Sequence, residues 1–360
     1  MTTDTNEKQT LRIERLTDEV KELRAVAKAA RKSERLAEDV HAAVFGLKAE
    51  GPRPAWLTPK TTAPGAPGMP MTIWSDWHLG EVVTSSETNG QNVFNWKVAE
   101  ERITKLVNKT SEMCFSHMAK ADFPGIVVAL GGDMVSGDIH EILRQTNETT
   151  LLPTIRRGAG LIIAGLRQIA DKFERVFVPC VSGNHGRTTK RIEHKLFTDT
   201  NADNMIYMLV RDALEGDTRF HFHIPASNEA HFQVYGHRFL LLHGHDLGVR
   251  GGDGIIGSIG PITRGKLKVG AQARAMGKDF DTLIIGHWHQ YIQLRGLIVN
   301  GTLKGFDGFA NSGLRAAPEP AQQALWFLHP KYGITARWPI FLQAERTAGR
   351  ARKVLSWEAE

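Results

Sequence analysis

Residues 74–80 read Trp-Ser-Asp-Trp-His-Leu-Gly, directly after the apolar residues Met-Thr-Ile at 71–73. Within this stretch, Asp76 and His78 stand two positions apart at the end of an expected strand. Residues i and i+2 of an extended chain share a face, so both side chains can reach one ion. A match this short can arise by chance, and a solvated strand end would have the same residues. The interpretation as a metal site therefore depends on the rest of the chain.

Four more blocks of potential metal ligands follow in order. They are Gly131-Gly132-Asp133, Gly183-Asn184-His185, His243-Gly244-His245 and Gly286-His287-Trp288-His289. Each block comes after a short apolar run, where a strand is expected to give way to a loop. In open α/β sheets, ligand sites form in the loops beyond the carboxyl ends of the strands. All five blocks are expected there.

The order of the expected elements predicts the fold class. Helices are expected at 95–119, 139–172 and 191–214. Strands are expected at 71–76, 125–130, 175–181, 219–224, 231–236, 238–243, 282–286, 291–300, 324–329 and 333–341. A β-α-β-α-β-α beginning followed by a strand-rich half indicates an α/β fold. We expect a four-layer α-β-β-α sandwich, in which two mixed sheets pack face to face with helices outside.

Composition indicates a globular protein. Of 360 residues, 41% are apolar and 23% are charged, and the formal net charge of +6 permits polyanionic partners without demonstrating them. The two cysteines, Cys114 and Cys180, are far apart, which favours buried thiols in a reducing compartment over a disulfide framework. No signal-peptide pattern and no apolar run of the roughly 18 residues that span a bilayer are found. We expect a cytoplasmic protein without membrane association.

The chain is expected to have four regions. Residues 1–50 form a helical extension, because residues 8–43 contain neither Gly nor Pro. Its apolar residues follow a short heptad pattern, which leaves open a coiled coil that makes a homo-oligomer or a helix that packs on its own domain. Residues 51–70 contain six prolines and are expected to be a linker. The main folded domain is expected at 71–343, followed by a basic and polar tail at 344–360.

The residue types in the blocks indicate which metals fit. The proposed ligands are Asp76, His78, Asp133, Asn184, His243, His287 and His289. Mixed oxygen and imidazole ligands suit Mn, Fe or Zn, with Mg less favoured. Seven ligands are too many for one ion and suit two if one carboxylate bridges. Two ions about 3.5–4 Å apart can hold the attacking and leaving oxygens of a displacement at phosphorus. His185, beside a ligand, could steady the phosphoryl oxygens or protonate the leaving alkoxide.

The ordered set Asp-x-His, Gly-Asp, Gly-Asn-His, His and Gly-His-x-His resembles the calcineurin-like metallophosphoesterase superfamily, over residues 71–340. The resemblance implies hydrolysis of phosphomonoesters or phosphodiesters, commonly with Mn, with His185 as the catalytic histidine. It also implies the ligand sets: Asp76, His78 and His289 for the first metal, Asp133 as the bridge, and Asn184, His243 and His287 for the second. Residues 75–80 and 131–133 are most similar to the Mre11/SbcD-type nuclease branch.

One departure from the family pattern concerns the residues after His185. An acid is usual there, but Gly186 and Arg187 follow. Another group must then orient His185, and Asp138 is a candidate, although a plain loop carboxylate or a helix N-cap fits it equally well. Arg187 could bind a substrate phosphate or be an exposed loop residue.

Two further residues follow His243 directly. His245 and Asp246 could line the site or support a ligand imidazole. Trp74 is expected in the core, whereas Trp77 and Trp288 could be core residues or stack on a base.

Two basic stretches suggest the substrate. They comprise Arg187, Lys190, Arg191 and Lys195, and then Arg250, Arg264, Lys266, Lys268, Arg274 and Lys278 in a glycine-rich loop leading to a short helix. Cations that border a metal site could follow the phosphate backbone of DNA or RNA, although a solvated basic surface has the same composition. A metal-dependent nuclease is the favoured hypothesis. The alternatives are a phosphomonoesterase or small-nucleotide phosphodiesterase, and a non-catalytic scaffold assembled through its N-terminal helix.

Overall fold

The computed structural model describes residues 54–57, 68–118, 121–249 and 257–343. The expected helix over residues 8–43 and the tail at 344–360 lie outside the described residues, as does most of the expected linker. Within that linker, residues 55–57 form a short 3-10 helix whose Leu57 side chain is buried, and the first strand already begins at Met69. These two parts of the linker therefore belong to the folded domain.

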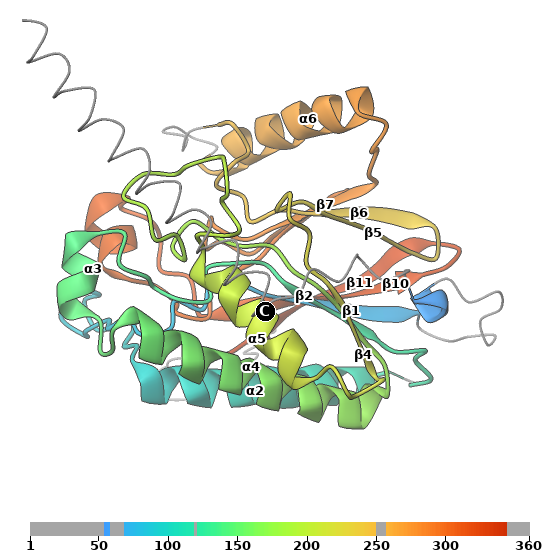
Figure 1. Ribbon diagram of the computed structural model, residues 1–360, viewed down its shortest axis with the longest axis horizontal. Helices are drawn as coiled ribbons and strands as arrows, with labels where there is room; N and C mark the ends of the chain where they lie inside the picture. Colours follow the sequence, from blue (N-terminus) through green and yellow to red (C-terminus); the bar gives the residue numbers. More distant parts are fainter. Residues whose placement is uncertain (1–53, 58–67, 119–120, 250–256, 344–360) are drawn as a thin grey trace, which may run out of the picture. The chain divides into compact units, whose positions relative to one another are not determined.

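The first of two sheets has the strand order β11-β10-β1-β2-β3-β4 (Figure 1). Its strands are β1 (Met69–Trp74), β2 (Ile126–Leu130), β3 (Val176–Pro179), β4 (Phe220–His223), β10 (Gln322–His329) and β11 (Gly333–Phe341). Neighbours from β1 to β4 are parallel, whereas β10 is antiparallel to both β1 and β11. The sheet is thus mixed, and the carboxyl ends of its parallel strands meet at one edge.

The second sheet has the order β5-β6-β7-β9-β8. Its strands are β5 (Ala230–Val234), β6 (His237–Leu241), β7 (Thr282–Ile285), β8 (Ile292–Leu294) and β9 (Leu297–Val299). The pairs β6–β7 and β7–β9 are parallel, and the two outer pairs are antiparallel. This sheet is mixed as well.

Side chains that alternate along the strands produce the layers. Met71 and Ile73 of β1 enter a core between the two sheets, whereas Trp74 faces the opposite way, into a core shared with helices. The helices on that side are α2 (Trp96–Phe115), α4 (Leu151–Phe173) and α5 (Ala202–Ala213). Helix α6 (Ile259–Ala275) covers the outer face of the second sheet (Figure 1). The predicted four-layer α/β sandwich is confirmed.

The helix predicted at 139–172 is two helices, α3 (Glu141–Thr146) and α4. Pro153 is the third residue of α4, in the first turn, where its missing N–H costs no intrahelical hydrogen bond. A continuous helix would place this proline in its interior. The sequence prediction was wrong because it gave Pro153 too little weight.

Three other elements differ from the prediction. The helix expected from 191 begins only at Ala202, because Thr188 and Thr200 pair through their backbones and close residues 188–200 into a loop. The strand expected at 291–300 is a hairpin of β8 and β9, turning at Gly296, whose φ of +70° favours glycine. The glycine-rich stretch before His287 also contains a longer helix than expected, the 17-residue α6.

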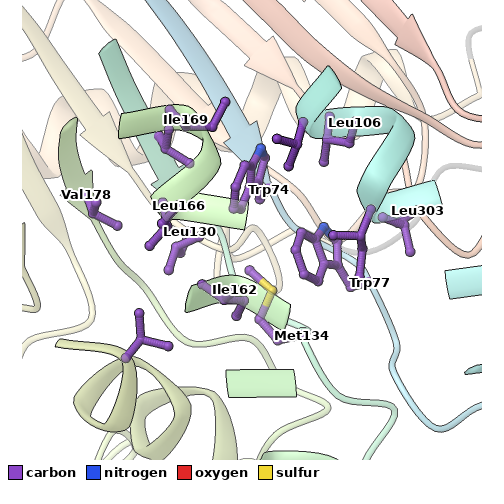
Figure 2. Packing of buried hydrophobic residues seen from close by; sticks show 14 of the residues in the cluster. Trp74, Trp77, Leu106, Leu130, Met134, Ile162, Leu166, Ile169, Val178 and Leu303 are labelled. Atoms are coloured by element: carbon purple, nitrogen blue, oxygen red, sulfur yellow. The ribbon is translucent and has the colours of Figure 1, made fainter. Parts of the chain in front are cut away.

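The two tryptophans beside the first block lie in the core, and their rings are 5.6 Å apart (Figure 2). Trp77 packs near Leu303, and Trp74 packs against α4, where Gly165 leaves room for its ring. Trp77 is thus a core residue and cannot stack on a base. Trp288 is only partly buried. Among the described residues, no helix is long and apolar enough to cross a bilayer.

Candidate metal centre

The five blocks lie in the loops that follow β1, β2, β3, β6 and β7. Contacts between the blocks join the two sheets. The Nε2 atom of His243, after β6, is 3.0 Å from Oδ2 of Asp133, after β2. The backbone N–H of His287, after β7, donates to Oδ1 of Asp76, after β1, at 2.9 Å. The loops that follow the parallel strands of the two sheets therefore meet at one place, as expected for a site of this fold.

The first potential ligand group contains Asp76, His78 and His289, whose ligand atoms lie within 4.8 Å of one another. The Nε2 atoms of the two histidines are 3.0 Å apart, and His289 Nε2 is 3.4 Å from Oδ1 of Asp76. Three donor atoms thus converge on one point. Asp76 and His78 have no exposed surface, whereas the side chain of His289 is 29% exposed.

Asp133 belongs to two such groups. One contains Asp133, His243 and His287, and the other contains Asp133, His78 and His185. Its side chain is 1% exposed and lies between the histidines of the first sheet and those of the second. Of the carboxylates in the described part of the chain, Asp133 alone occurs in more than one group. A carboxylate in this position can contact two ions.

Several atoms at the centre are buried without a hydrogen-bond partner in the described structure. They include Asn184 Oδ1, and also Asp133 Oδ2 and His243 Nε2, which face each other at 3.0 Å and form a hydrogen bond only when Nε2 carries a proton. A buried polar atom without a partner costs free energy, and such atoms are rare. The Nδ1 atom of His243 is 2.8 Å from the carbonyl oxygen of Gly131, an arrangement that directs Nε2 and its lone pair towards Asp133. A cation bound to these atoms would satisfy all three, so this donor set fits a metal.

Electrostatics support the same conclusion. Burial alone would lower the pKa of His243, but the Asp133 carboxylate outweighs this effect and raises the pKa to about 10. The environment of Asp133 and His243 therefore favours a bound positive charge, either a proton or a cation. Burial lowers the pKa of both His78 and His287 well below the usual value, with further lowering by Lys304 and His243 respectively. Both rings are therefore neutral, as metal ligation requires.

The backbone is in an uncommon conformation at five of the seven proposed ligands. Their φ angles are positive, between 48° and 69°: Asp76, His78, Asp133, His287 and His289. Such angles are uncommon outside glycine and typically cost about 1–3 kcal/mol each. Hydrogen bonds hold the first of these turns, since the carbonyl oxygen of Asp76 accepts from Thr302 Oγ1 at 2.8 Å and from the Leu303 amide at 3.1 Å. Strain of this kind concentrates at functional sites.

His185 is partly exposed beside the centre. Its backbone N–H donates to Oδ1 of Asp133 at 2.7 Å, and its ring is 4.6 Å from that of His78. The ring Nδ1 is 2.8 Å from the carbonyl oxygen of Ser136. Asp138, the candidate for orienting His185, is exposed, and the group in contact with the His185 ring nitrogen is the carbonyl oxygen of Ser136.

The other expected site residues lie at the edge of the centre. Arg187 donates from Nη1 to the carbonyl oxygen of Asn184 at 2.6 Å. The ring of His245 is 5.5 Å from that of His243, and burial, followed by the charge of His243, lowers the pKa of His245 to about 4. Asp246 is exposed, and its charge acts in the opposite direction on that pKa. No hydrogen bond to a proposed metal ligand is described for His245 or Asp246, so their roles remain predictions.

Sequence reasoning missed one buried carboxylate beneath the site, Asp203. It accepts hydrogen bonds from the backbone amides of Asp133, Met134 and Gly183. Burial, followed by the charge of Asp133, raises the pKa of Asp203 to about 6. Its sequence context, the first turn of a helix after the N-cap Asn201, gives no indication of this contact.

Comparison with known proteins identifies no family. No family model and no curated protein matches the chain. One similar solved structure is described as "Putative 5'-Nucleotidase from Staphylococcus aureus in complex with alpha-ketoglutarate". The similarity has a TM-score of 0.33 and 13% sequence identity, and it covers 76% of this chain. This chain spans about half of that protein, 54% of its length. A similarity this low supports no conclusion about function.

Proposed function

We propose that this chain is a metal-dependent phosphoesterase that holds two divalent ions, with Mn favoured and Fe, Zn or Mg as alternatives. The observation that carries the proposal is the position of Asp133, in reach of two separate groups of histidine donors. Asp76, His78 and His289 would hold one ion, and Asn184, His243 and His287 the other, with Asp133 between them. Imidazole together with carboxylate and amide oxygen is the donor set of such metals.

Ions bound there supply Lewis acidity towards phosphoryl oxygens and lower the pKa of water. The protein's own contribution is orientation. Because Nδ1 of His185 donates to the carbonyl oxygen of Ser136, Nε2 is the nitrogen that, when the ring is protonated, can deliver its proton to a leaving oxygen and so return to the neutral form. The hydrogen bond from its backbone N–H to Asp133 fixes the distance of His185 from the centre.

For the substrate, we propose a phosphodiester in DNA or RNA. The loop closed by Thr188 and Thr200 reaches the site, since its Phe197 stacks on His245 with ring centroids 5.2 Å apart. This loop carries exposed Lys190, Arg191 and Lys195. Cations on a loop that contacts the centre favour a polyanionic substrate. The likeness to Mre11/SbcD-type nucleases in residues 75–80 agrees with this choice, and we propose a cytoplasmic location.

The test compares bis-p-nitrophenyl phosphate with p-nitrophenyl phosphate in the presence of Mn, together with single- and double-stranded oligonucleotides over a range of salt concentrations. A nuclease cleaves the diester and the oligonucleotides, and its oligonucleotide affinity falls steeply with salt. If the monoester is cleaved at least as fast as the diester and no oligonucleotide is cleaved, the protein is a phosphomonoesterase. Absence of hydrolysis by the Mn-loaded chain would favour the scaffold.

A further inference from the structure

A buried group of three charged side chains lies next to the centre. The Nζ atom of Lys304 is 3.0 and 3.1 Å from the two carboxylate oxygens of Glu81, and 2.6 Å from Oδ2 of Asp307. All three residues are less than 9% exposed, and Lys304 is 3% exposed. Buried lysines are rare, and desolvation of such ions is costly, so this arrangement has no obvious benefit for stability alone.

The Glu81 carboxylate lies beside both histidines that the proposed chemistry needs. Its Oε2 atom accepts a hydrogen bond from Ser136 Oγ at 3.2 Å and is 3.7 Å from the Nδ1 atom of His78. The carbonyl oxygen of Ser136, in turn, is 2.8 Å from the Nδ1 atom of His185. One carboxylate therefore borders a proposed metal ligand and, through Ser136, the proposed catalytic histidine.

Lys304 is itself held in place. Its carbonyl oxygen accepts hydrogen bonds from Asn92 Nδ2 at 2.9 Å and from Arg102 Nη1 at 2.5 Å. These bonds fix its backbone, and Asp307 holds its Nζ atom, so Lys304 can keep Glu81 in one orientation. The residue after His185 is Gly186, which has no side chain that could orient this imidazole.

We propose that Glu81, held by Lys304, is a positioning residue that sets the orientation of the metal ligand His78 and, through Ser136, that of His185. The proposal rests on the phosphoesterase function proposed above. A carboxylate that accepts a hydrogen bond from a ligand imidazole fixes its tautomer, and its loss typically lowers metal affinity about 10–100-fold. The 3.7 Å between Glu81 Oε2 and His78 Nδ1 is longer than a hydrogen bond, so Glu81 acts on His78 through its charge and we expect an effect at the lower end of that range.

The test uses the full chain and the isosteric variant Glu81→Gln, with Glu112→Gln as matched control. Glu112 forms an exposed ion pair with Lys109 on α2 and contacts none of the site residues in the described structure. Mn²⁺ affinity of the metal-free chain is measured by calorimetry. Turnover is measured on an alkyl and an aryl ester of the class that the wild-type chain hydrolyses. An alkyl leaving group depends more on proton donation by His185 than an aryl group does.

Glu81→Gln is expected to bind Mn²⁺ about 10-fold more weakly. Its kcat is expected to fall more on the alkyl than on the aryl ester, whereas Glu112→Gln equals wild type in both assays. Wild-type Mn²⁺ affinity and an unchanged ratio of the two kcat values in Glu81→Gln would overturn the proposal.

If Glu81→Gln fails to fold, Ser136→Ala tests the link to His185, because it removes only the hydroxyl group. An unchanged ratio of kcat values in that variant would equally overturn it. A wild-type chain that binds no Mn²⁺ and cleaves no ester would instead refute the phosphoesterase function, and this inference with it.

Discussion

The Oδ2 atom of Asp203 accepts a hydrogen bond from the backbone amide of Asp133 at 2.8 Å. The same oxygen accepts from the amide of Gly183 at 2.9 Å, and Oδ1 accepts from the amide of Met134 at 3.0 Å. One carboxylate in the first turn of α5 therefore joins the loop after β2 to the loop after β3. These loops carry Asp133 and Asn184, so their relative positions depend on a residue outside the five blocks.

The variant Asp203→Asn tests whether these hydrogen bonds hold the two loops together. An amide has one oxygen instead of two, so its NH2 group would face at least one backbone N–H donor and leave it buried and unsatisfied. Each such donor costs about 1–3 kcal/mol. We expect a free energy of unfolding lower by about that amount, together with weaker Mn²⁺ binding. Urea unfolding and calorimetry measure the two effects. Wild-type values for both would show that the loops do not depend on Asp203.

Gly183→Ala tests how closely the same loops approach. A Cβ atom at residue 183 would overlap the side chain and the backbone nitrogen of Asp133. We expect loss of Mn²⁺ binding and of hydrolysis. The matched control is Gly160→Ala in α4, where a Cβ atom meets nothing within 4 Å. Removing a glycine from a helix interior should stabilise the control by roughly 0.5–1 kcal/mol without a change in turnover. Equal activity of the two variants would contradict this geometry.

His185→Ala separates catalysis from metal binding. The hydrogen bond to Asp133 comes from the backbone of residue 185, so alanine retains it. The variant should keep its metal content while kcat falls about 100- to 10,000-fold, the range of general acid catalysis. Metal analysis of the purified protein and steady-state kinetics give the two numbers. Wild-type kcat would assign the proton transfer to another group, and loss of metal would make His185 a ligand.

Removal of metal should destabilise the protein, because the proposed ligands include buried atoms without other partners in the described structure. A ligand present at 100 times its Kd stabilises the folded state by about 2.7 kcal/mol. We therefore expect a chelator to lower Tm and added Mn²⁺ to restore it, as measured by calorimetric scans. In His243→Ala, the chelator should shift Tm much less. A Tm that is independent of chelator in the wild-type chain would contradict the presence of a metal centre.

His237 should make stability depend on pH. Burial lowers the pKa of its imidazole, whose Nε2 atom is 2.8 Å from Thr282 Oγ1. The unfolded chain then binds more protons than the folded chain as pH falls below about 6.5. The contribution to stability is complete above that pH and is lost as the pH drops towards the folded pKa. His237→Gln should therefore have a smaller loss of stability between pH 7 and 5 in urea titrations. The same slope in both proteins would contradict the assignment.

The fold class and the ligand blocks could be predicted because both depend on local patterns. Short apolar runs predicted the strands, and the position of each block after such a run placed Asp76, Asp133 and His243 at strand ends. The period of two along a strand fixes the faces of its side chains, whatever the rest of the chain does. The break before α4 was missed because Pro153 was given too little weight.

The remaining features depend on contacts between distant residues. No neighbouring residue in the sequence indicates that Asp203 holds the loop of Asp133. In the same way, nothing near Lys304 indicates that it pairs with Glu81, which is 223 residues away. The burial of Trp77 and the orientation of His185 by Ser136 are of the same kind. The amino-acid sequence by itself determined which donor atoms are present and at which strand ends they stand, because these follow from residue type and short-range geometry. Only the tertiary structure decided which backbone and side-chain groups hold those donors, because a hydrogen bond or an ion pair requires its two atoms to meet in space.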